Sequence, residues 1–410
     1  MSALEDAVAT LQANWGYSAF RSLQRRAVLA CLTGRDSLTI LPTGGGKSLC
    51  YQVPALLLPG LTIVVSPLIS LMQDQVAALR RRGIAAAYLS STQRPDLQRA
   101  VWDAVLAGKI KLLYLAPERL AQLPVRLKQV EVSLLAVDEA HCISEWGHDF
   151  RPVYRTVGVI RNALGGPPTI AVTGTATPAT RDDIIRVLDL RRPARVTGSF
   201  DRPNLRFDVR RVPDERTRFQ AVVSLLGGIA GTGGSAVVYL PTRNRADGVA
   251  AALRRFGFPA APYHAALPPG ARRALLSRFL DGHFRVIAAT NAFGMGIDKP
   301  DVRLVAHLGV PPRPEAYYQE AGRAGRDGQP ARCVLFWTER DFILAGAFGG
   351  GAAGPSEGVS PDLVAARRHG LETMRRYVTT RGCRRRVLLE YLGEDRVRCA
   401  GCDRCGGGLR

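Results

Sequence analysis

Short apolar runs that end in turn or polar residues recur along most of this sequence, and amphipathic helical stretches separate them. In the first half these runs are Leu61–Ser66, Leu112–Ala116, Leu134–Asp138 and Thr169–Thr173. The pattern restarts in the second half with Ala236–Leu240, Arg285–Ala289, Leu304–Leu308 and Cys333–Trp337. Strands that alternate with helices form βαβ units around a parallel sheet. The sequence therefore predicts an α/β protein with two parallel-sheet units in tandem.

Glycine-rich stretches indicate where these units begin and end. The segment Gly227–Gly234 is expected to form an exposed loop, and residues 346–361, with six glycines, a linker. The remainder starts with a helical pattern and ends in clustered cysteines. We predict a first unit over residues 1–205, a second over 206–345, and a small domain over 362–410.

The charge of the chain points to a polyanionic partner. Lysine and arginine number 56 against 35 acidic residues, a net charge of +21. Genome composition could exchange lysine for arginine, but that exchange would leave the net charge unchanged. A polyanion, nucleic acid first, is therefore favoured over a purely colloidal role for the charge.

Membrane and export interpretations are disfavoured. The acidic start of the chain lacks the order of a signal peptide. The apolar segment from residue 53 to 72 contains Pro54, Pro59 and Pro67, which would break a spanning helix, so two short buried elements are expected there. We expect no membrane association and a cytoplasmic location, with the nucleoid if the protein is bacterial.

A phosphate-binding loop is predicted directly after the strand Ser37–Leu41, and it comprises Thr43, Gly44, Gly45, Gly46, Lys47 and Ser48. Backbone N–H groups of the glycines and the following helix N-terminus can surround a phosphate. Lys47 can reach the β- and γ-phosphates, and Ser48 can bind Mg²⁺. Leu41 stands where the strict pattern has glycine. The alternative is a flexible loop with a chance lysine.

An acidic pair, Asp138 and Glu139, ends the apolar run that starts at Leu134. Carboxylates at the carboxyl end of a parallel strand lie at the edge where such sheets bind ligands. The pair can hold Mg²⁺ and orient a water molecule. An acidic helix cap is the alternative, but Lys47 upstream favours the catalytic interpretation.

Two arginines, Arg323 and Arg326, lie in a glycine-rich segment of the second half. Arginines there could reach a transferring phosphoryl group, whereas the alternative is a solvated basic turn. Since Lys47 and Asp138 belong to the first half, a nucleotide between the halves would contact both. Hydrolysis could then drive domain motion.

Four cysteines of the tail, Cys383, Cys399, Cys402 and Cys405, have the spacing of a closed metal site. Fifteen residues separate the first two, and two residues separate each later pair. Because no export signal supports a disulfide framework, structural Zn²⁺ is favoured over redox cysteines.

From about Trp15 to Cys405 the sequence resembles the RecQ family of DNA helicases in superfamily two. The segment from Phe20 to Gln24 resembles the leading motif of that family, which implies that Arg21 and Gln24 contribute to ATP binding and that Gln24 reads adenine. Residues 41–48 are similar to its phosphate loop, and residues 138–141 to its DEAH box. This implies Mg²⁺ contact by Asp138 and water activation by Glu139.

Further stretches carry the resemblance. Residues 65–75 and 115–119 resemble DNA-contacting motifs, and residues 173–177, 200–204 and 290–300 match other family motifs. Residues 141–152 resemble the aromatic-rich loop that senses single-stranded DNA in RecQ proteins. Its candidate DNA-binding side chains are Trp146, His148, Phe150 and Arg151. Aromatic rings can stack on bases and an arginine can meet a phosphate, whereas core packing of Trp146 and Phe150 is the alternative.

The resemblance implies two RecA-like lobes with Mg-ATP between them and a small helical zinc-binding domain. It implies an ATP-dependent helicase that moves 3′ to 5′ on single-stranded DNA and unwinds forked duplexes in repair, recombination or replication. The sequence stops five residues after Cys405, where family members often continue into winged-helix and HRDC domains. A DNA-stimulated translocase with weak strand separation is therefore an alternative. A non-enzymatic DNA-binding zinc protein and an RNA helicase are more remote.

Overall fold

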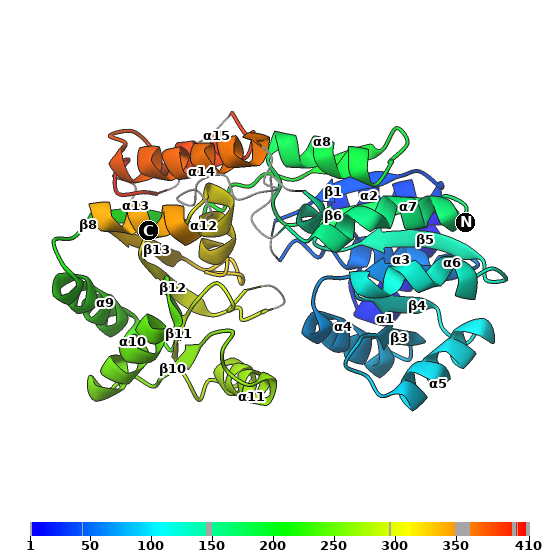
Figure 1. The fold of residues 1–410 in the computed structure, drawn as a ribbon, viewed down its shortest axis with the longest axis horizontal. Coiled ribbons are helices and arrows are strands. Elements are labelled where there is room, and N and C mark those ends of the chain that lie inside the picture. Colours follow the sequence, from blue (N-terminus) through cyan, green and yellow to red (C-terminus); the bar gives the residue numbers. More distant parts are fainter. Residues whose placement is uncertain are drawn as a thin grey trace. The chain divides into compact units, whose positions relative to one another are not determined.

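The computed structural model describes residues 2–42, 44–144, 150–294, 297–348, 361–395, 399 and 401–406. The chain divides into two compact units, which we call the first lobe (Met1–Phe200) and the second lobe (Asp201–Arg410). Each lobe is built around its own parallel sheet with helices packed against it (Figure 1). The predicted α/β class with two parallel-sheet units is confirmed.

The sheet of the first lobe runs in the order β3-β4-β2-β5-β6-β1-β7. Its strands are β1 (Ser37–Ile40), β2 (Leu61–Val65), β3 (Ala86–Leu89), β4 (Leu112–Leu115), β5 (Val132–Val137), β6 (Thr169–Thr173) and β7 (Ala194–Thr197). The register pairs Ile40 with Thr173 and Val65 with Val137. The segments that follow β1, β2, β5 and β6 therefore emerge at one edge of the sheet, where parallel sheets bind their ligands.

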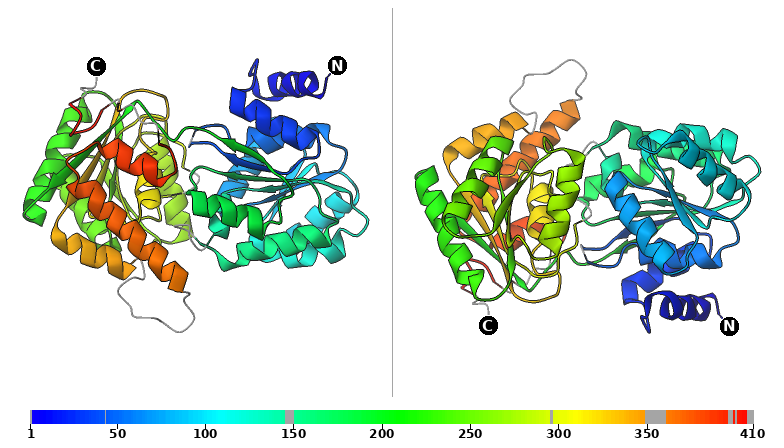
Figure 2. Two further views of the ribbon diagram at one scale, coloured as in Figure 1. Left: turned by 90° about the horizontal axis from the view of Figure 1, so that it is seen from above. Right: turned by 90° about the horizontal axis from the view of Figure 1, so that it is seen from below.

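Helices lie on both faces of this sheet, with α1 and α2 on one face and α7 on the other (Figure 2). Cys31 of α2, Tyr51 of α3 and Met72 of α4 share a core cluster with the strands. In α4 the buried residues Met72, Val76 and Leu79 repeat at helical spacing, which explains why this segment forms an amphipathic helix. The helices are α1 (Ala3–Trp15), α2 (Ser22–Leu32), α3 (Leu49–Leu57), α4 (Ile69–Arg81), α5 (Pro95–Leu106), α6 (Leu123–Arg126), α7 (Thr156–Ala163) and α8 (Pro178–Val187), and the 3-10 helices are η1 (Pro117–Gln122), η2 (Ala140–Ile143) and η3 (Pro152–Arg155).

The sheet of the second lobe runs in the order β10-β11-β9-β12-β13-β8. Its strands are β8 (Leu205–Arg211), β9 (Ser235–Tyr239), β10 (Ala260–Tyr263), β11 (Val286–Ala289), β12 (Val302–Leu308) and β13 (Ala331–Trp337). Its helices are α9 (Glu215–Ala230), α10 (Arg243–Arg255), α11 (Pro269–Leu280), α12 (Pro314–Ala321), α13 (Glu339–Phe348), α14 (Pro361–Thr379) and α15 (Arg384–Tyr391).

Two core clusters cover the two faces of this second sheet. One contains Val222 of α9 and Leu253 of α10. The other brings Tyr317 of α12 together with Met374 of α14 and Leu388 of α15. The helices of the cysteine-containing tail therefore pack on the second lobe and share its core.

Two expectations about glycine-rich segments were wrong in part. Gly227 and Gly228 lie inside α9, and only the residues from 231 onward form the loop. A Cβ on either glycine would meet no atom within 4 Å, so each is an exposed helix position, where glycine costs about 1 kcal/mol. Burial of Val222 and Leu226 at helical spacing outweighs that cost. In the predicted linker, Gly346 belongs to α13 and Pro361 begins α14, whereas residues 349–360 lie outside the described residues.

The apolar segment that starts at Val53 forms the end of α3, then β2, then the start of α4. Pro54 lies inside α3. Proline lacks the N–H that would bond the carbonyl of Cys50, and that carbonyl instead lies 3.7 Å from the thiol of Cys31. Across the described part of the chain no helix combines the length and apolar character that a membrane span needs.

Candidate nucleotide and zinc sites

The predicted phosphate loop lies between β1 and the N-terminus of α3 in the first lobe. Gly44 and Gly46 have φ angles of +78° and +69°, which glycine adopts without strain. Ser48 stands directly before α3, so the positive end of that helix faces the loop. Lys47 is half-buried, and its charge is close enough to Asp138 to lower the pKa of that carboxyl. Thr43 lies outside the described residues.

Gln24 and Arg21 hold the phosphate loop from the start of α2. The amide nitrogen of Gln24 donates to the carbonyl of Gly45 at 3.0 Å and to that of Gly46 at 3.3 Å. Its oxygen accepts from the backbone N–H of Arg21 at 3.0 Å, and the guanidinium of Arg21 donates to Gly44 at 3.2 Å. The amide of Gln24 is thus engaged by the chain itself, and its role in reading adenine stays a prediction.

Asp138 follows β5 and is buried, with 6% of its surface exposed. The backbone N–H of Glu139 donates to its Oδ1 at 2.9 Å, and the hydroxyl of Tyr51 donates to its Oδ2 at 3.5 Å. Burial and the neighbouring carboxylate of Glu139 raise the pKa of Asp138 to about 7, although Lys47 opposes the shift. An ionised Asp138 is therefore costly until a cation neutralises it.

Hard oxygen ligands for Mg²⁺ meet at this point. The carboxylate of Asp138 and the hydroxyl of Ser48 both contact the hydroxyl of Tyr51. Oxygen atoms of carboxylates and hydroxyls are the ligands that Mg²⁺ prefers in proteins. The oxygen atoms of Asp138 and Ser48 therefore fit the predicted Mg²⁺. A bound cation would stabilise the charged form of Asp138 and so lower its raised pKa.

We expect Asp138→Asn to stabilise the protein in Mg²⁺-free buffer at pH 8. A carboxyl whose folded pKa lies above its unfolded value binds more protons in the fold, so unfolding becomes easier as pH rises from about 4 to about 7. The asparagine variant escapes this loss. Its gain in unfolding free energy should approach zero near pH 4 and reach roughly 4 kcal/mol above pH 7, measured by chemical denaturation.

A matched variant at Asp36 should change the stability in the opposite direction. Asp36 is also buried, but both its oxygens accept from the guanidinium of Arg161 at 2.8 Å. Asp36→Asn removes a paired charge and should destabilise the protein at pH 8. If Asp138→Asn destabilised the protein in Mg²⁺-free buffer, this result would contradict the raised pKa of Asp138.

Glu139 occupies a strained backbone position. Its φ is +47° and its ψ +47°, in the left-handed region that non-glycine residues rarely adopt. Its carboxylate lies 3.4 Å from Nδ1 of His141, and that nitrogen is 2.8 Å from the hydroxyl of Thr173 at the end of β6. Strain of this kind persists where the surrounding structure imposes a conformation, most often at functional sites.

The aromatic-rich loop is only partly described. Trp146 and His148 lie outside the described residues. Phe150 is half-buried, and the guanidinium of Arg151 donates to the carbonyl of Pro67 at 2.8 Å. Arg151 thus ties the end of this loop to the segment after β2, where the sequence predicts a DNA-contacting motif. DNA contact by these four residues stays a prediction.

The two predicted arginines lie in the second lobe, in a segment that we call the arginine loop (residues 322–328). Arg323 is 7% exposed and the side chain of Arg326 is 11% exposed. Burial and the neighbouring charge of Arg323 lower the pKa of Arg326, while Asp298 opposes the shift with a hydrogen bond at 2.9 Å. Among the described residues, Nε of each arginine lacks a hydrogen-bond partner. Two buried cations this close suit an anionic ligand.

The four predicted zinc ligands come together in the structure. One sulfur atom from each of Cys383, Cys399, Cys402 and Cys405 lies within 4.8 Å of all the others. Tetrahedral Zn²⁺ with Zn–S bonds of about 2.3 Å requires sulfur atoms of this proximity, so the donor set fits the ion. The four cysteines are free thiols.

Backbone N–H groups point at two of these sulfurs. Burial raises the pKa of Cys402, but N–H groups of Arg384 and Arg404 bring it down to about 7. The sulfur of Cys383 caps α15 by accepting from the N–H of Arg386 at 3.4 Å. At Cys402 the N–H groups favour the anionic form, which is the form that binds zinc.

Several residues that support these sites were not predicted from the sequence. Tyr51 and Tyr154 contact Asp138 through a side-chain oxygen and the backbone carbonyl, respectively. Tyr51 comes one helical turn after Lys47, so its spacing could have signalled that it faces the loop. Arg202 and Arg385 were not assigned either, because their partners are backbone carbonyls distant in sequence.

Comparison with protein families finds three matches along the chain. A family model for DEAD/DEAH box helicases matches residues 21–184, and one for the helicase conserved C-terminal domain matches residues 217–328. A RecQ zinc-binding model matches residues 357–406. The first two matches cover the phosphate loop, the acidic pair and the arginine loop, and the third covers the four cysteines.

Known proteins resemble the chain over almost all of its length. The ATP-dependent DNA helicase RecQ of Haemophilus influenzae is 41% identical over 97% of this chain and 63% of its own length. The "Probable ATP-dependent DNA helicase RecS" of Bacillus subtilis is 42% identical over 82% of this chain and 67% of its own length. The crystal structure of the helicase MrfA bound to DNA and AMPPNP superposes with a TM-score of 0.69 at 19% identity, covering 85% of this chain and 53% of that one. This likeness confirms two RecA-like lobes, and the chain spans about 63% of the first RecQ relative.

Proposed function

We propose that this chain, which belongs to the RecQ family of helicases, is an ATP-dependent DNA helicase that couples ATP hydrolysis to 3′–5′ movement on single-stranded DNA. One observation carries the proposal. The first lobe brings the phosphate loop beside a buried Asp138 whose ionisation needs a cation, and the second lobe carries the buried Arg323 and the partly buried Arg326, which suit an anion. These features support the assignment of phosphate and metal binding to the first lobe and of further contacts to the anion to the second.

In this proposal Lys47 and the loop amides bind the β- and γ-phosphates, and Ser48 and Asp138 hold the metal. Mg²⁺, when bound, neutralises charge on the phosphate oxygens. Glu139 orients the attacking water, and its strained backbone fixes where that carboxylate points. His141 links Glu139 to Thr173, so the end of β6 positions the same group.

Arg323 and Arg326 stabilise the charge that develops on the transferring phosphoryl group. A guanidinium in this role contributes about 10³–10⁵ in rate in well-studied nucleotide hydrolases. These arginines belong to the second lobe and Lys47 to the first, so ATP hydrolysis in this proposal uses residues of both lobes and would drive translocation.

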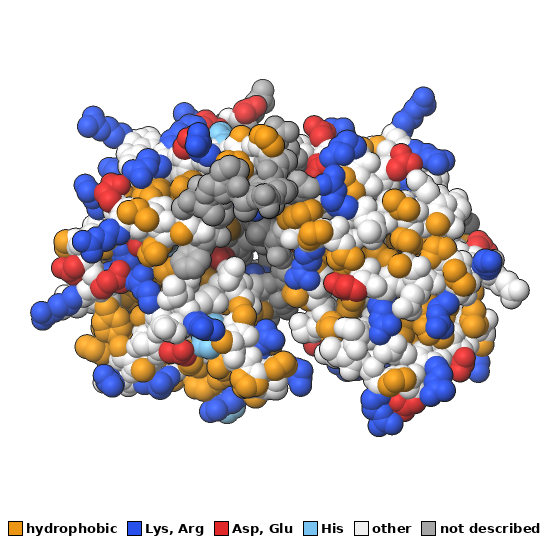
Figure 3. Space-filling view, viewed as in Figure 1, with side chains coloured by type: hydrophobic (Ala, Val, Ile, Leu, Met, Phe, Trp, Pro, Cys, Tyr) orange, Lys and Arg blue, Asp and Glu red, His pale blue; other side chains and the backbone are white. Residues whose placement is uncertain are grey.

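DNA is the polyanion that we propose for the net charge of +21. Figure 3 shows lysine and arginine side chains spread over the visible faces of both lobes rather than gathered in one patch. Charge by itself therefore does not mark the DNA path. We propose that Trp146, His148, Phe150 and Arg151 contact single-stranded DNA, with forked duplexes as the substrate for unwinding in repair, recombination or replication. In a bacterium that substrate lies in the cytoplasmic nucleoid.

A DNA-stimulated translocase without efficient strand separation is the second candidate. The chain matches only 63% of the length of its RecQ relative from Haemophilus influenzae, so strand-separating elements of that protein can lie outside the matched part. Unwinding of a 3′-tailed duplex, measured beside ATPase activity, separates the two candidates.

We expect single-stranded DNA to raise the ATPase rate at least about tenfold, and Trp146→Ala to abolish this stimulation while basal hydrolysis persists. The physical reason is that a base stacked on the aromatic loop can act on Glu139, only seven residues earlier. The measurement is phosphate release with no nucleic acid, single-stranded DNA or single-stranded RNA. Stimulation by RNA alone would refute the DNA assignment, and full DNA stimulation of the variant would refute the role of Trp146.

A further inference from the structure

We propose that Arg202 and Asn204 are positioning residues for ATP hydrolysis, because they hold the backbone of the arginine loop and so set where Arg323 and Arg326 point. This inference rests on the proposed function of the two arginines. It extends that function to residues 201–205, which follow the last strand of the first lobe in the sequence and lead into β8 of the second lobe. We call these residues the anchor segment.

Arg202 binds the arginine loop through three backbone carbonyls. Its guanidinium donates to the carbonyl of Gly322 at 3.3 Å, to that of Ala324 at 3.1 Å and to that of Gly325 at 2.8 Å. These carbonyls flank Arg323 on both sides in sequence. The planar guanidinium thus holds three backbone carbonyls from two separate nitrogen atoms. The single nitrogen of a lysine ammonium group cannot reproduce this geometry.

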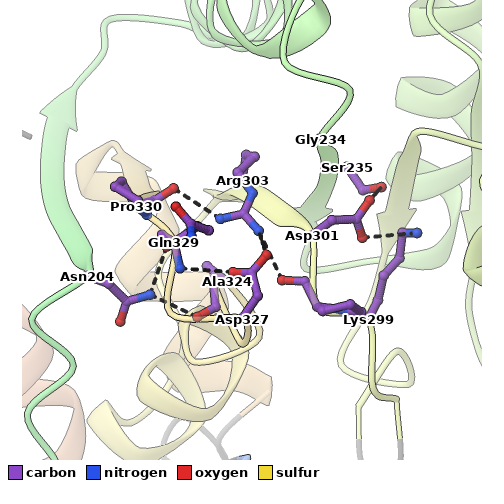
Figure 4. A network of polar contacts seen from close by, with 12 residues as sticks. Asn204, Gly234, Ser235, Lys299, Asp301, Arg303, Ala324, Asp327, Gln329 and Pro330 are labelled. Atoms are coloured by element: carbon purple, nitrogen blue, oxygen red, sulfur yellow. Dashed lines mark hydrogen bonds and ion pairs between the residues drawn. The ribbon is translucent and has the colours of Figure 1, made fainter.

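Asn204 holds the same loop from a second direction. Its amide nitrogen donates to the carbonyl of Gly325 at 2.8 Å and to that of Gln329 at 2.9 Å (Figure 4). Gly325 has a φ of +55°, and a Cβ there would come within 2.5 Å of the amide nitrogen of Asn204. The close approach of Asn204 therefore requires a glycine directly before Arg326.

The opposite side of the loop is held as well, so the anchor segment acts on a constrained element. The N–H of Gly325 donates to the carbonyl of Val302 at 2.9 Å. Arg303 forms an ion pair with Asp327 and donates to the carbonyl of Pro330 at 3.3 Å, as Figure 4 shows. Because the loop is held on both sides, loss of the Arg202 bonds would let it shift toward Val302 and Arg303.

The anchor segment is itself fastened by α15. The buried guanidinium of Arg385 donates to the carbonyl of Arg202 at 2.8 Å, and it pairs with Asp201. The carbonyl of Leu205 accepts from the same side chain. Arg385 also lies over the ring of Phe207, 5.3 Å from its centroid. One buried arginine of the tail therefore fixes the backbone from which Arg202 and Asn204 reach the arginine loop.

The role of these residues is positioning, since the bonds of Arg202 and Asn204 go to backbone carbonyls of the loop and its neighbour Gln329. Transition-state stabilisation by a guanidinium depends steeply on its placement, and a misplacement of about 1 Å can cost roughly 100-fold in rate. The same displacement changes ATP affinity much less when the group acts mainly in the transition state.

The test is Arg202→Lys in the full chain, with Arg254→Lys as the matched control. Arg254 of α10 also donates to a backbone carbonyl of the second lobe, that of Ala260 at 3.0 Å, but it does not contact the arginine loop. We expect Arg202→Lys to lower the DNA-stimulated kcat about tenfold or more while the Kd of a non-hydrolysable ATP analogue changes less than about threefold. Amide hydrogen exchange across residues 322–328 should rise in this variant and not in the control. Asn204→Ala provides a second variant with the same expected direction.

A variant that lacks both loop arginines separates positioning from general loss of structure. Arg323→Ala combined with Arg326→Ala should lower kcat strongly, and adding Arg202→Lys to that pair should lower kcat by less than about threefold more, because both positioned groups are already absent. Full multiplication of the two losses would overturn the positioning role, and so would normal kcat in both Arg202→Lys and Asn204→Ala. If Arg323→Ala combined with Arg326→Ala keeps normal kcat, the proposed function of the arginine loop fails first, and this inference fails with it.

Discussion

ATP hydrolysis should fall by about 100-fold or more when Lys47 is replaced by alanine, while the fold persists. Lys47 is the cation of the phosphate loop, and removing it withdraws charge stabilisation from the transferring phosphoryl group. Its side chain is half-buried and contributes little to the core of the first lobe. The measurement is kcat for phosphate release at saturating DNA, together with thermal unfolding of the same variant.

Two further variants sharpen that experiment. Lys109→Ala removes an exposed lysine of the same lobe and should leave hydrolysis unchanged. Glu139→Gln should keep ATP affinity but slow turnover, because it alters the water-orienting group alone. Near-normal hydrolysis by a folded Lys47→Ala would remove the loop from the mechanism, and lost ATP affinity in Glu139→Gln would contradict the role of Glu139.

Replacement of Cys402 by serine is expected to release zinc and to destabilise the second lobe as a whole. Cys402 is fully buried in the core that contains Phe207, Tyr317 and Met374. Its backbone also forms a bridge to Phe207 on β8. Because the ion closes a segment that continues the lobe's core, its loss should cost several kcal/mol, on the order of 3 or more. Metal analysis and chemical denaturation measure the two effects.

A control variant distinguishes zinc loss from the loss of any buried thiol. Cys31→Ala in the first lobe should retain one zinc per chain, since Cys31 packs among apolar residues there. A zinc-free Cys402→Ser protein with unchanged stability would contradict the structural role. So would a wild-type protein that carries no zinc when freshly purified.

The residues to which we assign chemistry in the proposed function could be predicted from the sequence, because chemistry imposes local patterns. Three consecutive glycines before Lys47, an acidic pair after an apolar run and four spaced cysteines each lie within a short segment. The strands that carry them were also predictable from their apolar runs. Strands with a weaker signal were missed, among them β7, in which only Val196 is buried, and β8, which is covered by the tail.

Tertiary contacts decided which secondary structure the glycine-rich segments form. The sequence from Gly227 to Ala230 predicts a loop by composition, but burial of Leu226 one helical turn from Val222 keeps it in α9. Intrinsic preference is a weak predictor when a neighbouring side chain is buried, since packing contributes more than the cost of about 1 kcal/mol for a helical glycine.

By itself, the sequence determined the fold class, and it predicted the phosphate loop, the carboxylates, the arginines and the zinc ligands, since each depends on residue type and short spacing. Only the tertiary structure decided how these groups are held. It alone revealed the raised pKa of Asp138, which comes from burial and a like charge, and the left-handed backbone of Glu139. It alone joined Arg202 to loop carbonyls about 120 residues away in sequence. The physical reason is that side chain to backbone bonds use a group that every residue carries, so no residue pattern marks the partner.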